Sequence, residues 1–170
     1  MQQPHLHRTT ENDRATKSTI DSAGIVGSYP SITISTGGNP IISYYDTTHG
    51  DLKIAACKNP TCTGTTENDR ATKFILDSAN DVGWDTSITI GTNGNPMISY
   101  QDNSTDDLKI AACNNPTCTT STNTTIESAG MVGYYTSITI GTNGNPIISY
   151  FDLRHEDLKV VSPWWLTGGR

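Results

Sequence analysis

The chain has 170 residues, of which 34% are hydrophobic and 16% charged, so it is long enough to bury an ordinary core. Its net charge is −6 at pH 7, and no cluster of lysine and arginine stands out. Nucleic acids and anionic membranes attract a basic face, so we expect neither as a partner. No apolar run approaches the roughly 20 residues that span a bilayer, and we therefore expect no membrane segment.

A repeated tetrapeptide, SITI, organises the chain. It occurs at Ser31–Ile34, Ser87–Ile90 and Ser137–Ile140, and such a period near fifty residues is typical of blade or solenoid repeats. Each unit of this kind buries its apolar face against a neighbour. Residues 18–161 are therefore predicted to form three repeats, at about 18–73, 74–123 and 124–161.

Both ends of the chain depart from the repeat. Residues 1–17 are interpreted as a leader and a polar loop, and the first residues lack the apolar core of a signal peptide. Thr9–Lys17, TTENDRATK, recurs unchanged at Thr65–Lys73, and its mixed charge without apolar period predicts a loop insert. Residues 162–170 form a tail in which Trp164 and Trp165 are expected to cap an exposed edge or occupy an interface.

Each repeat contains four short segments with strand character and no sustained helical period, which predicts an all-β fold. An Asn-Gly pair between the first two segments favours a hairpin. Proline at the first position of the second segment is tolerated there because its missing N–H is not needed. In the middle repeat the predicted strands are Ser87–Ile90, Pro96–Asp102, Asp107–Cys113 and Thr124–Glu127.

Repeated four-stranded antiparallel units predict a β-propeller built of blades. The first strand of each blade then lies nearest the axis, and the linkers Ala23–Pro30, Ala79–Thr86 and Ala129–Thr136 cross one face. Ser18–Ser22 resembles a fourth strand, while the last repeat stops after its third, an arrangement that suits closure by complementation. Three blades are too few for a ring, so we expect either a homodimer with six blades or a piece of a longer propeller.

The four cysteines come in two equivalent pairs, Cys57 with Cys62 and Cys113 with Cys118. A pair that recurs once per repeat favours a local disulfide in each copy. A single zinc site made from all four is the alternative, but equivalent positions a blade apart lie too far from one ion. Disulfides indicate an oxidising compartment, extracellular or at the cell surface.

The segments ISYYD (Ile42–Asp46) and GDLK (Gly50–Lys53) resemble tandem repeats of exported bacterial proteins. The resemblance covers about residues 18–161. It implies a propeller-type fold and export, and it carries no catalytic residues that could be transferred to this chain. The Asp-box of sialidases and the Trp-Asp ending of other propeller blades are both missing from the sequence.

Residues that recur in every copy are interpreted as scaffold. The aspartate that ends the second strand is expected to accept backbone N–H bonds in the following turn. In the Asp-Leu-Lys trio, leucine is expected to point inward while aspartate and lysine point outward. His49 and His155 are interpreted as exposed turn residues without a catalytic partner. The acidic turn Asp102–Asp107 lacks the glycine and glutamate of an EF-hand loop.

The variable positions after Val-Gly in the linkers are the candidate ligand-binding residues. They are Tyr29, Trp84, Asp85, Tyr134 and Tyr135. Aromatic faces beside polar side chains suit sugar rings, which offer C–H patches together with hydroxyls. Packing of these aromatics between blades is the alternative.

We therefore expect a non-catalytic binding module, lectin-like in its use of several equivalent sites. A structural or protein-interaction repeat at the cell surface is the second hypothesis. A glycan hydrolase or lyase is the third, since acidic residues spread over many turns leave a carboxylate pair open. The sequence identifies no catalytic residue, no metal ligand and no cofactor.

Overall fold

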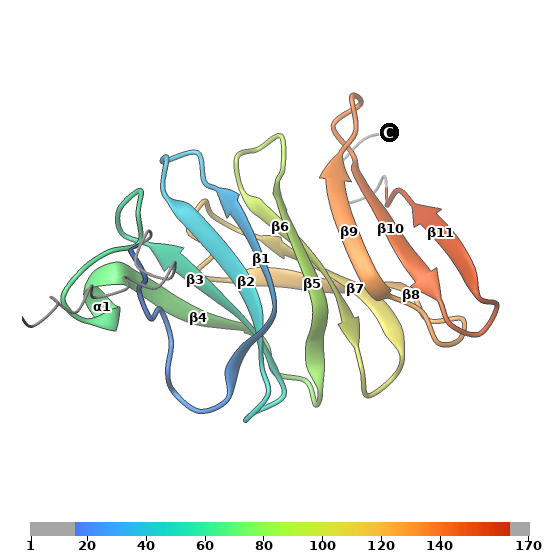
Figure 1. Cartoon of the computed structure of the whole chain (residues 1–170). Helices are drawn as coiled ribbons and strands as arrows, with labels where there is room; N and C mark the ends of the chain where they lie inside the picture. Colours follow the sequence, from blue (N-terminus) through green and yellow to red (C-terminus); the bar gives the residue numbers. More distant parts are fainter. Residues whose placement is uncertain (1–15, 164–170) are drawn as a thin grey trace, which may run out of the picture.

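The computed structural model describes residues 16–163 and consists of three antiparallel β-sheets that follow one another across the molecule (Figure 1). Sheet 1 contains β1 (Val26–Ile34), β2 (Pro40–Asp46), β3 (Asp51–Cys57) and β4 (Ala71–Asp77). Sheet 2 contains β5 (Val82–Ile90), β6 (Pro96–Asp102), β7 (Asp107–Cys113) and β8 (Ser121–Glu127). Sheet 3 contains β9 (Tyr134–Ile140), β10 (Pro146–Asp152) and β11 (Asp157–Val161). The predicted all-β class is thus confirmed.

Local chemistry explains the strand boundaries. Gly38, Gly94 and Gly144 close the first hairpin of each sheet with φ between 79° and 83°, a conformation that glycine adopts without steric cost. The second strand of every sheet then begins at a proline. It ends at an aspartate whose carboxylate accepts backbone N–H bonds, as Asp46 does from Thr48 and His49. The expected role of the recurring aspartate is confirmed.

The first strands begin earlier than the sequence predicts. Val82–Thr86 was expected in a linker that crosses the face, but it forms the first half of β5 and pairs with β6. A register shift interrupts the pairing between Trp84 and Ser87, which marks a β-bulge. β1 has the same irregularity between Ser28 and Ser31. At a bulge, consecutive side chains no longer alternate between the two faces of the sheet. The two-residue hydrophobic period that predicts a strand is therefore lost in this part of the sequence.

The segment TTENDRATK is not simply a loop. In its second copy, Glu67–Arg70 forms the one-turn helix α1, capped by Thr66, whose side chain accepts the N–H of Asp69. The last three residues, Ala71–Lys73, begin β4. The first copy lies largely outside the described residues, as do residues 1–15 of the predicted leader and loop and the tail residues Trp164 and Trp165.

The core lies between consecutive sheets. One face of sheet 1 contributes Leu52 and Ile54, which pack with Val82, Ile98 and Tyr100 of sheet 2. The opposite face of sheet 2 packs in the same way against sheet 3 through a second cluster: Met97, Leu108, Ile110, Val132, Ile138, Ile148 and Tyr150. These two clusters pack each sheet against its neighbour in the sequence, as expected for a repeat architecture. A third cluster, which includes Tyr44 and Ala55, lies on the other face of sheet 1.

Buried ion pairs accompany these apolar contacts. The Nζ atom of Lys109 lies 2.9 Å from an oxygen of Asp77 and 3.4 Å from one of Asp102. Lys53 makes the equivalent pairs and is only 9% exposed. The prediction that this lysine points outward is therefore wrong. A buried ammonium needs partners, and two aspartates from different segments of the chain supply them for each lysine.

Both expected disulfides are present, with sulfur–sulfur bonds between Cys57 and Cys62 and between Cys113 and Cys118. The described residues contain no free cysteine. Two disulfides indicate an extracellular or otherwise oxidising environment. Between residues 16 and 163, no helix has the length and apolar character that crossing a membrane requires.

Candidate functional site: aromatic clusters at the sheet junctions

Three aromatic rings meet where sheet 1 contacts sheet 2, and we call them the first aromatic cluster. The ring of Tyr29 lies 5.3 Å from that of Trp84, at an interplanar angle of 31°. Tyr45 completes the group, with ring centroids 6.2 Å from Tyr29 and 5.6 Å from Trp84. Tyr45 is buried, whereas Tyr29 is 39% exposed. Part of this aromatic surface therefore faces solvent.

The carboxylate of Asp81 organises the polar side of this cluster. Its Oδ1 accepts hydrogen bonds from the hydroxyl of Tyr45 at 2.5 Å and from Nε1 of Trp84 at 3.0 Å. Its Oδ2 accepts one from Nδ2 of Asn103 at 2.7 Å. Burial works to raise the pKa of Asp81, but these three hydrogen bonds lower it overall. The group is therefore charged at neutral pH.

A β-bulge sets the direction of the exposed aromatic residues. Tyr29, Asp85 and Tyr135 occupy the same position in the three sheets and share φ values of 50°, 51° and 53°. Positive φ is uncommon for residues other than glycine, asparagine and aspartate. Such a conformation persists only where the surroundings fix it, and it clusters at functional positions.

A second aromatic cluster consists of Tyr134, Tyr135 and Phe151, all on sheet 3. The ring centroid of Tyr135 lies 6.5 Å from that of Tyr134 and 6.4 Å from that of Phe151. Tyr135 is 75% exposed, and its backbone N–H donates to Oδ2 of Asp85 at 2.8 Å. The hydroxyl of Tyr134 donates to Asp106 at 3.1 Å. Sheet 2 thus supplies acidic partners for the aromatic residues of sheet 3.

The structure divides the five candidate residues between two places. Tyr29 and Trp84 lie together at the first junction, and Asp85, Tyr134 and Tyr135 lie together at the second. All five lie within strands β1, β5 and β9, so their expected placement in loops between blades is wrong.

Tyr45, Asp81, Asn103 and Phe151 belong to the clusters but were not predicted. The alignment of the three copies carries a signal for two of these positions. Tyr45 corresponds to Gln101 and Phe151, while its neighbours barely change. Asp81 corresponds to Ile25 and Met131. Variation at a fixed position of a repeat is the signal that identifies both.

The turn after β2 brings together the ligand atoms of Asp46, His49 and Asp51 within 4.8 Å of one another. Oδ2 of Asp46 lies 3.0 Å from Nδ1 of His49 and 3.3 Å from Nζ of Lys53. His155 has the same relation to Asp152, at 2.8 Å. The histidines are exposed as predicted, but each has a carboxylate partner, contrary to expectation. The ammonium group of Lys53 would repel a metal cation bound at Asp46. We therefore interpret Asp46, His49 and Asp51 as residues that stabilise the turn.

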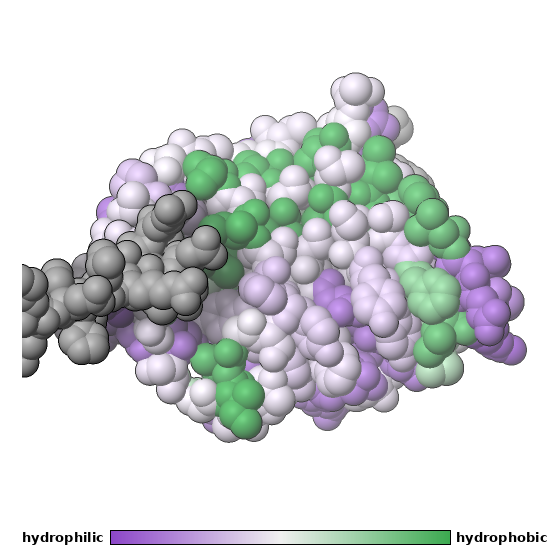
Figure 2. Space-filling model, viewed as in Figure 1, coloured by the Kyte–Doolittle hydropathy of each residue, from purple (hydrophilic) through white to green (hydrophobic). Residues whose placement is uncertain are grey.

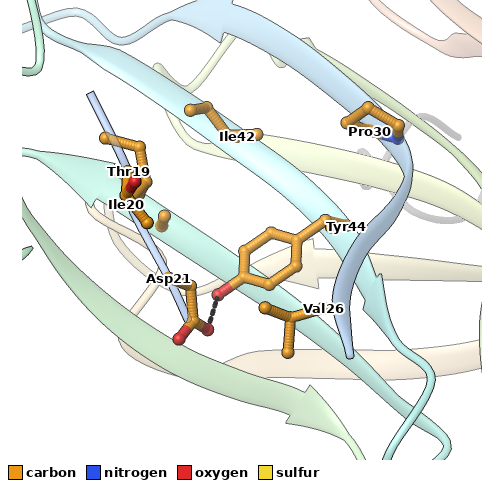
Figure 3. Close-up of a pocket in the computed structure, with 9 residues that line it drawn as sticks. Thr19, Ile20, Asp21, Val26, Pro30, Ile42 and Tyr44 are labelled. Atoms are coloured by element: carbon orange, nitrogen blue, oxygen red, sulfur yellow. Dashed lines mark hydrogen bonds between the residues drawn. The ribbon is translucent and has the colours of Figure 1, made fainter. Parts of the chain in front are cut away.

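A cavity of about 240 Å³ opens on the face of sheet 1 that sheet 2 does not cover (Figure 3). Its walls are mostly apolar, with Val26 and Ile42 on one side and Ile20 on the other. The hydroxyl of Tyr44 crosses it to donate to Oδ2 of Asp21 at 2.7 Å. The aromatic clusters do not line this cavity.

No family model matches the chain, and no curated protein does. Among solved structures, a fucose lectin from Kordia zhangzhouensis in complex with methyl-fucoside is similar, with a TM-score of 0.46 and 8% sequence identity. The similarity covers 78% of this chain and 90% of the lectin chain. The identity and the TM-score are both too low to support an inference about function.

Proposed function

We propose that the protein is a non-catalytic, lectin-like module that binds a neutral sugar at the first aromatic cluster. The observation that carries this proposal is the pair Tyr29 and Trp84, which bridges two sheets beside the charged carboxylate of Asp81. An exposed ring face accepts the C–H face of a sugar, and fixed polar groups at its edge orient the hydroxyls. The three sheets act in this proposal as blades of a β-propeller.

Charge favours a neutral sugar over an acidic one. Asp81 is ionised at the cluster, and the chain carries a net charge of −6. A carboxylated or sulfated sugar would meet like charge at close range, and among the described residues no lysine, arginine or histidine pairs with Asp81 to offset it. A carboxylate instead accepts hydrogen bonds from sugar hydroxyls, which are charge-assisted and short.

The second aromatic cluster supplies another site of the same kind. Tyr135 has the greater exposure, and Asp85 and Asp106 lie on the adjacent sheet. Two weak sites fixed on one scaffold bind a branched or surface-bound glycan more tightly than either binds a free sugar. The module is therefore proposed to act on polyvalent glycans at the outside of cells.

Screening on an array of neutral oligosaccharides, followed by titration of the best ligand, tests this function. Tyr29→Ala and Trp84→Ala are each expected to weaken binding about tenfold or more, since an aromatic contact contributes about 0.5–1.5 kcal/mol beyond its buried area. Ile75→Ser, on an exposed position of β4, is the matched control and should bind as the parent does. Circular dichroism of all three checks that they fold.

Absence of binding to every neutral sugar at millimolar concentration would contradict the proposal. So would a ligand bound equally by the parent and by both aromatic variants. In either case the second hypothesis, a protein-interaction repeat, would be the better description.

A further inference from the structure

The contacts between successive sheets repeat from one junction to the next. Gly83 of sheet 2 lies directly on Leu52 of sheet 1, because a Cβ added to Gly83 would be 2.7 Å from the Cα of Leu52. Gly133 of sheet 3 lies on Leu108 of sheet 2 in the same way, with the corresponding distance 3.0 Å. A leucine of one sheet therefore covers the glycine of the next.

Sheet 1 has an equivalent glycine, Gly27, and no side chain of residues 16–163 covers it. A Cβ added to Gly27 would meet no atom within 4 Å, and Gly27 lines the cavity of Figure 3. Ile32 is 62% exposed, whereas the equivalent Ile88 and Ile138 are each 7% exposed. In Figure 2, apolar side chains form a band over the upper part of the face in view, which extends from sheet 1 across to sheet 3. The open face of sheet 1 therefore presents the same kind of apolar side chain that the other two sheets bury at their junctions.

Sheet 3 has the complementary surface, which no other described residue covers. Leu158 and Val160 of β11 are 81% and 65% exposed. The equivalent residues in the other two sheets are fully buried. They are Leu52 and Leu108 at the position of Leu158, and Ile54 and Ile110 at the position of Val160. These are the side chains that fill the space at the junctions already formed.

Residues 18–21 lie against sheet 1 as an outer strand lies against the following sheet. Asp21 accepts the hydroxyl of Tyr44 and binds Nζ of Lys53, each at 2.7 Å. Asp77 of β4 makes the same contacts to Tyr100 and Lys109 of sheet 2.

The loop before β4 holds this segment in place. Arg70 Nη1 donates to the carbonyl of Thr19 at 2.8 Å, and the hydroxyl of Ser22 donates to Glu67 at 2.5 Å. β11 is the third strand of sheet 3, and among the described residues it pairs only with β10. Residues 18–21 thus occupy the place of an outer strand at one end of the three sheets, and β11 at the other end has no outer strand beside it among the described residues.

We propose that a second copy of this chain docks here, with its β11 paired to residues 18–21 and its Leu158 seated on Gly27. The pairs Leu52↔Asp77, Lys53↔Ile75 and Ile54↔Phe74 fix the register. Translated to the new contact, these give Leu158 opposite Asp21, Lys159 opposite Thr19 and Val160 opposite Ser18. The same contact made twice closes a ring of six sheets, the only multiple of three within the usual range of about 4–8.

One position differs from the junctions within the chain. Thr86 and Thr136 bond through their hydroxyls to Ser43 and Ser99 of the preceding sheet, but Pro30 stands at the equivalent place in sheet 1. The contact between copies therefore lacks this hydrogen bond. Apolar burial and strand pairing hold it, so it is expected to dissociate before the sheets of one chain separate.

Light scattering of the complete chain under non-reducing conditions tests the proposal. A single species of twice the 18.3 kDa of one chain is expected. Leu158→Asp should shift it to one chain with an unchanged circular dichroism spectrum, since Leu158 is exposed in a single copy. Ile75→Asp, an equally drastic change at an exposed position of β4, should leave the dimer intact. A monomeric parent, an open polymer or a dimer resistant to Leu158→Asp would overturn the proposal.

Cross-linking tests the register and does not depend on how Leu158→Asp folds. Thr19→Cys combined with Lys159→Cys should form a covalent dimer on mild oxidation, because paired strand residues lie within the 4.4–6.8 Å Cα separation that a disulfide needs. Thr19→Cys combined with Val161→Cys, two residues out of register, should cross-link at least tenfold less. Equal yields would overturn the pairing. The first aromatic cluster lies within one chain, so sugar binding by a monomeric variant separates the failure of this proposal from that of the proposed function.

Discussion

Asp77 at the end of β4 accepts a hydrogen bond of 2.6 Å from the hydroxyl of Tyr100, which belongs to the next sheet. Tyr100 is fully buried. Burial and the nearby carboxylate of Asp77 raise the pKa of this hydroxyl well above its ordinary value. This bond attaches the outer strand of sheet 1 to sheet 2, and Glu127 of β8 attaches sheet 2 to Tyr150 of sheet 3 in the same way.

Removing that hydroxyl should destabilise the fold. Tyr100→Phe deletes a buried hydrogen bond to a charged group, which costs about 1.5–3 kcal/mol, and the effect should appear as a lower midpoint in urea unfolding. Tyr135→Phe is the control, since its ring is largely exposed and a surface change of this kind costs about 0.5 kcal/mol or less. Equal effects of the two variants would contradict a special role for the Tyr100 hydroxyl.

Acid should weaken the contact between residues 18–21 and sheet 1. Burial tends to raise the pKa of Asp21, but hydrogen bonds from Lys53 and Tyr44 lower it from 3.8 to about 2. A carboxyl group with a lowered pKa contributes stability above its unfolded value and loses it as the pH falls through the folded value. The free energy of unfolding should therefore fall by about 1–2 kcal/mol for this group between about pH 4 and pH 2. Asp21→Asn should flatten that part of the pH profile, measured by urea unfolding at each pH.

The two disulfides should differ in their effect on stability. Closing a loop of this length contributes about 2 kcal/mol in the chain-entropy model, which applies to both. Cys113 and Cys118 also belong to the core between sheets 1 and 2, where Cys118 is fully buried. Replacing that pair by serine should therefore lower the melting temperature more than replacing Cys57 and Cys62. A larger loss from the Cys57–Cys62 pair would contradict this order.

Two equivalent glycines should respond differently to alanine. Gly83→Ala places a methyl group against Leu52 at a φ of 102°, so backbone strain and overpacking add to about 2–6 kcal/mol. Gly27→Ala at a φ of 93° adds strain alone in a single chain, about 1–3 kcal/mol. Both glycine substitutions are introduced into the Leu158→Asp variant, so that each protein is compared as a single chain. The difference in their free energies of unfolding is then measured by urea unfolding, relative to Leu158→Asp alone.

Much of the fold follows from short-range signals. The strands that start at Pro96 and Asp107 have the predicted bounds, because proline, the Asn-Gly turn and the terminal aspartate act locally. The first halves of β1 and β5 were missed since a bulge conceals their alternation. The helical turn of α1 depends on a cap at Thr66 that composition alone does not reveal.

Contacts over long separations explain what could not be predicted. Asp81 gains its role only when Tyr45, 36 residues earlier, and Asn103, 22 residues later, fold around it. The burial of Lys53 likewise depends on Asp21, which lies 32 residues before it. Spacing within one repeat contains no information about such pairs, whereas comparing the copies marks the variable positions.

Each outer strand pairs with one sheet through its backbone and contacts the following sheet through its acidic side chain. The boundary of the sequence repeat therefore does not coincide with the boundary of the hydrogen-bonded sheet. Sheet 1 ends at Asp77, yet the side chain of Asp77 serves Tyr100 and Lys109. A duplication or deletion of one whole period, cut just before an outer strand, keeps each outer strand beside the sheet whose tyrosine and lysine its acidic side chain contacts. Chains with different numbers of repeats would then have the same two terminal surfaces. Recombination could therefore change the number of repeats without requiring a new interface.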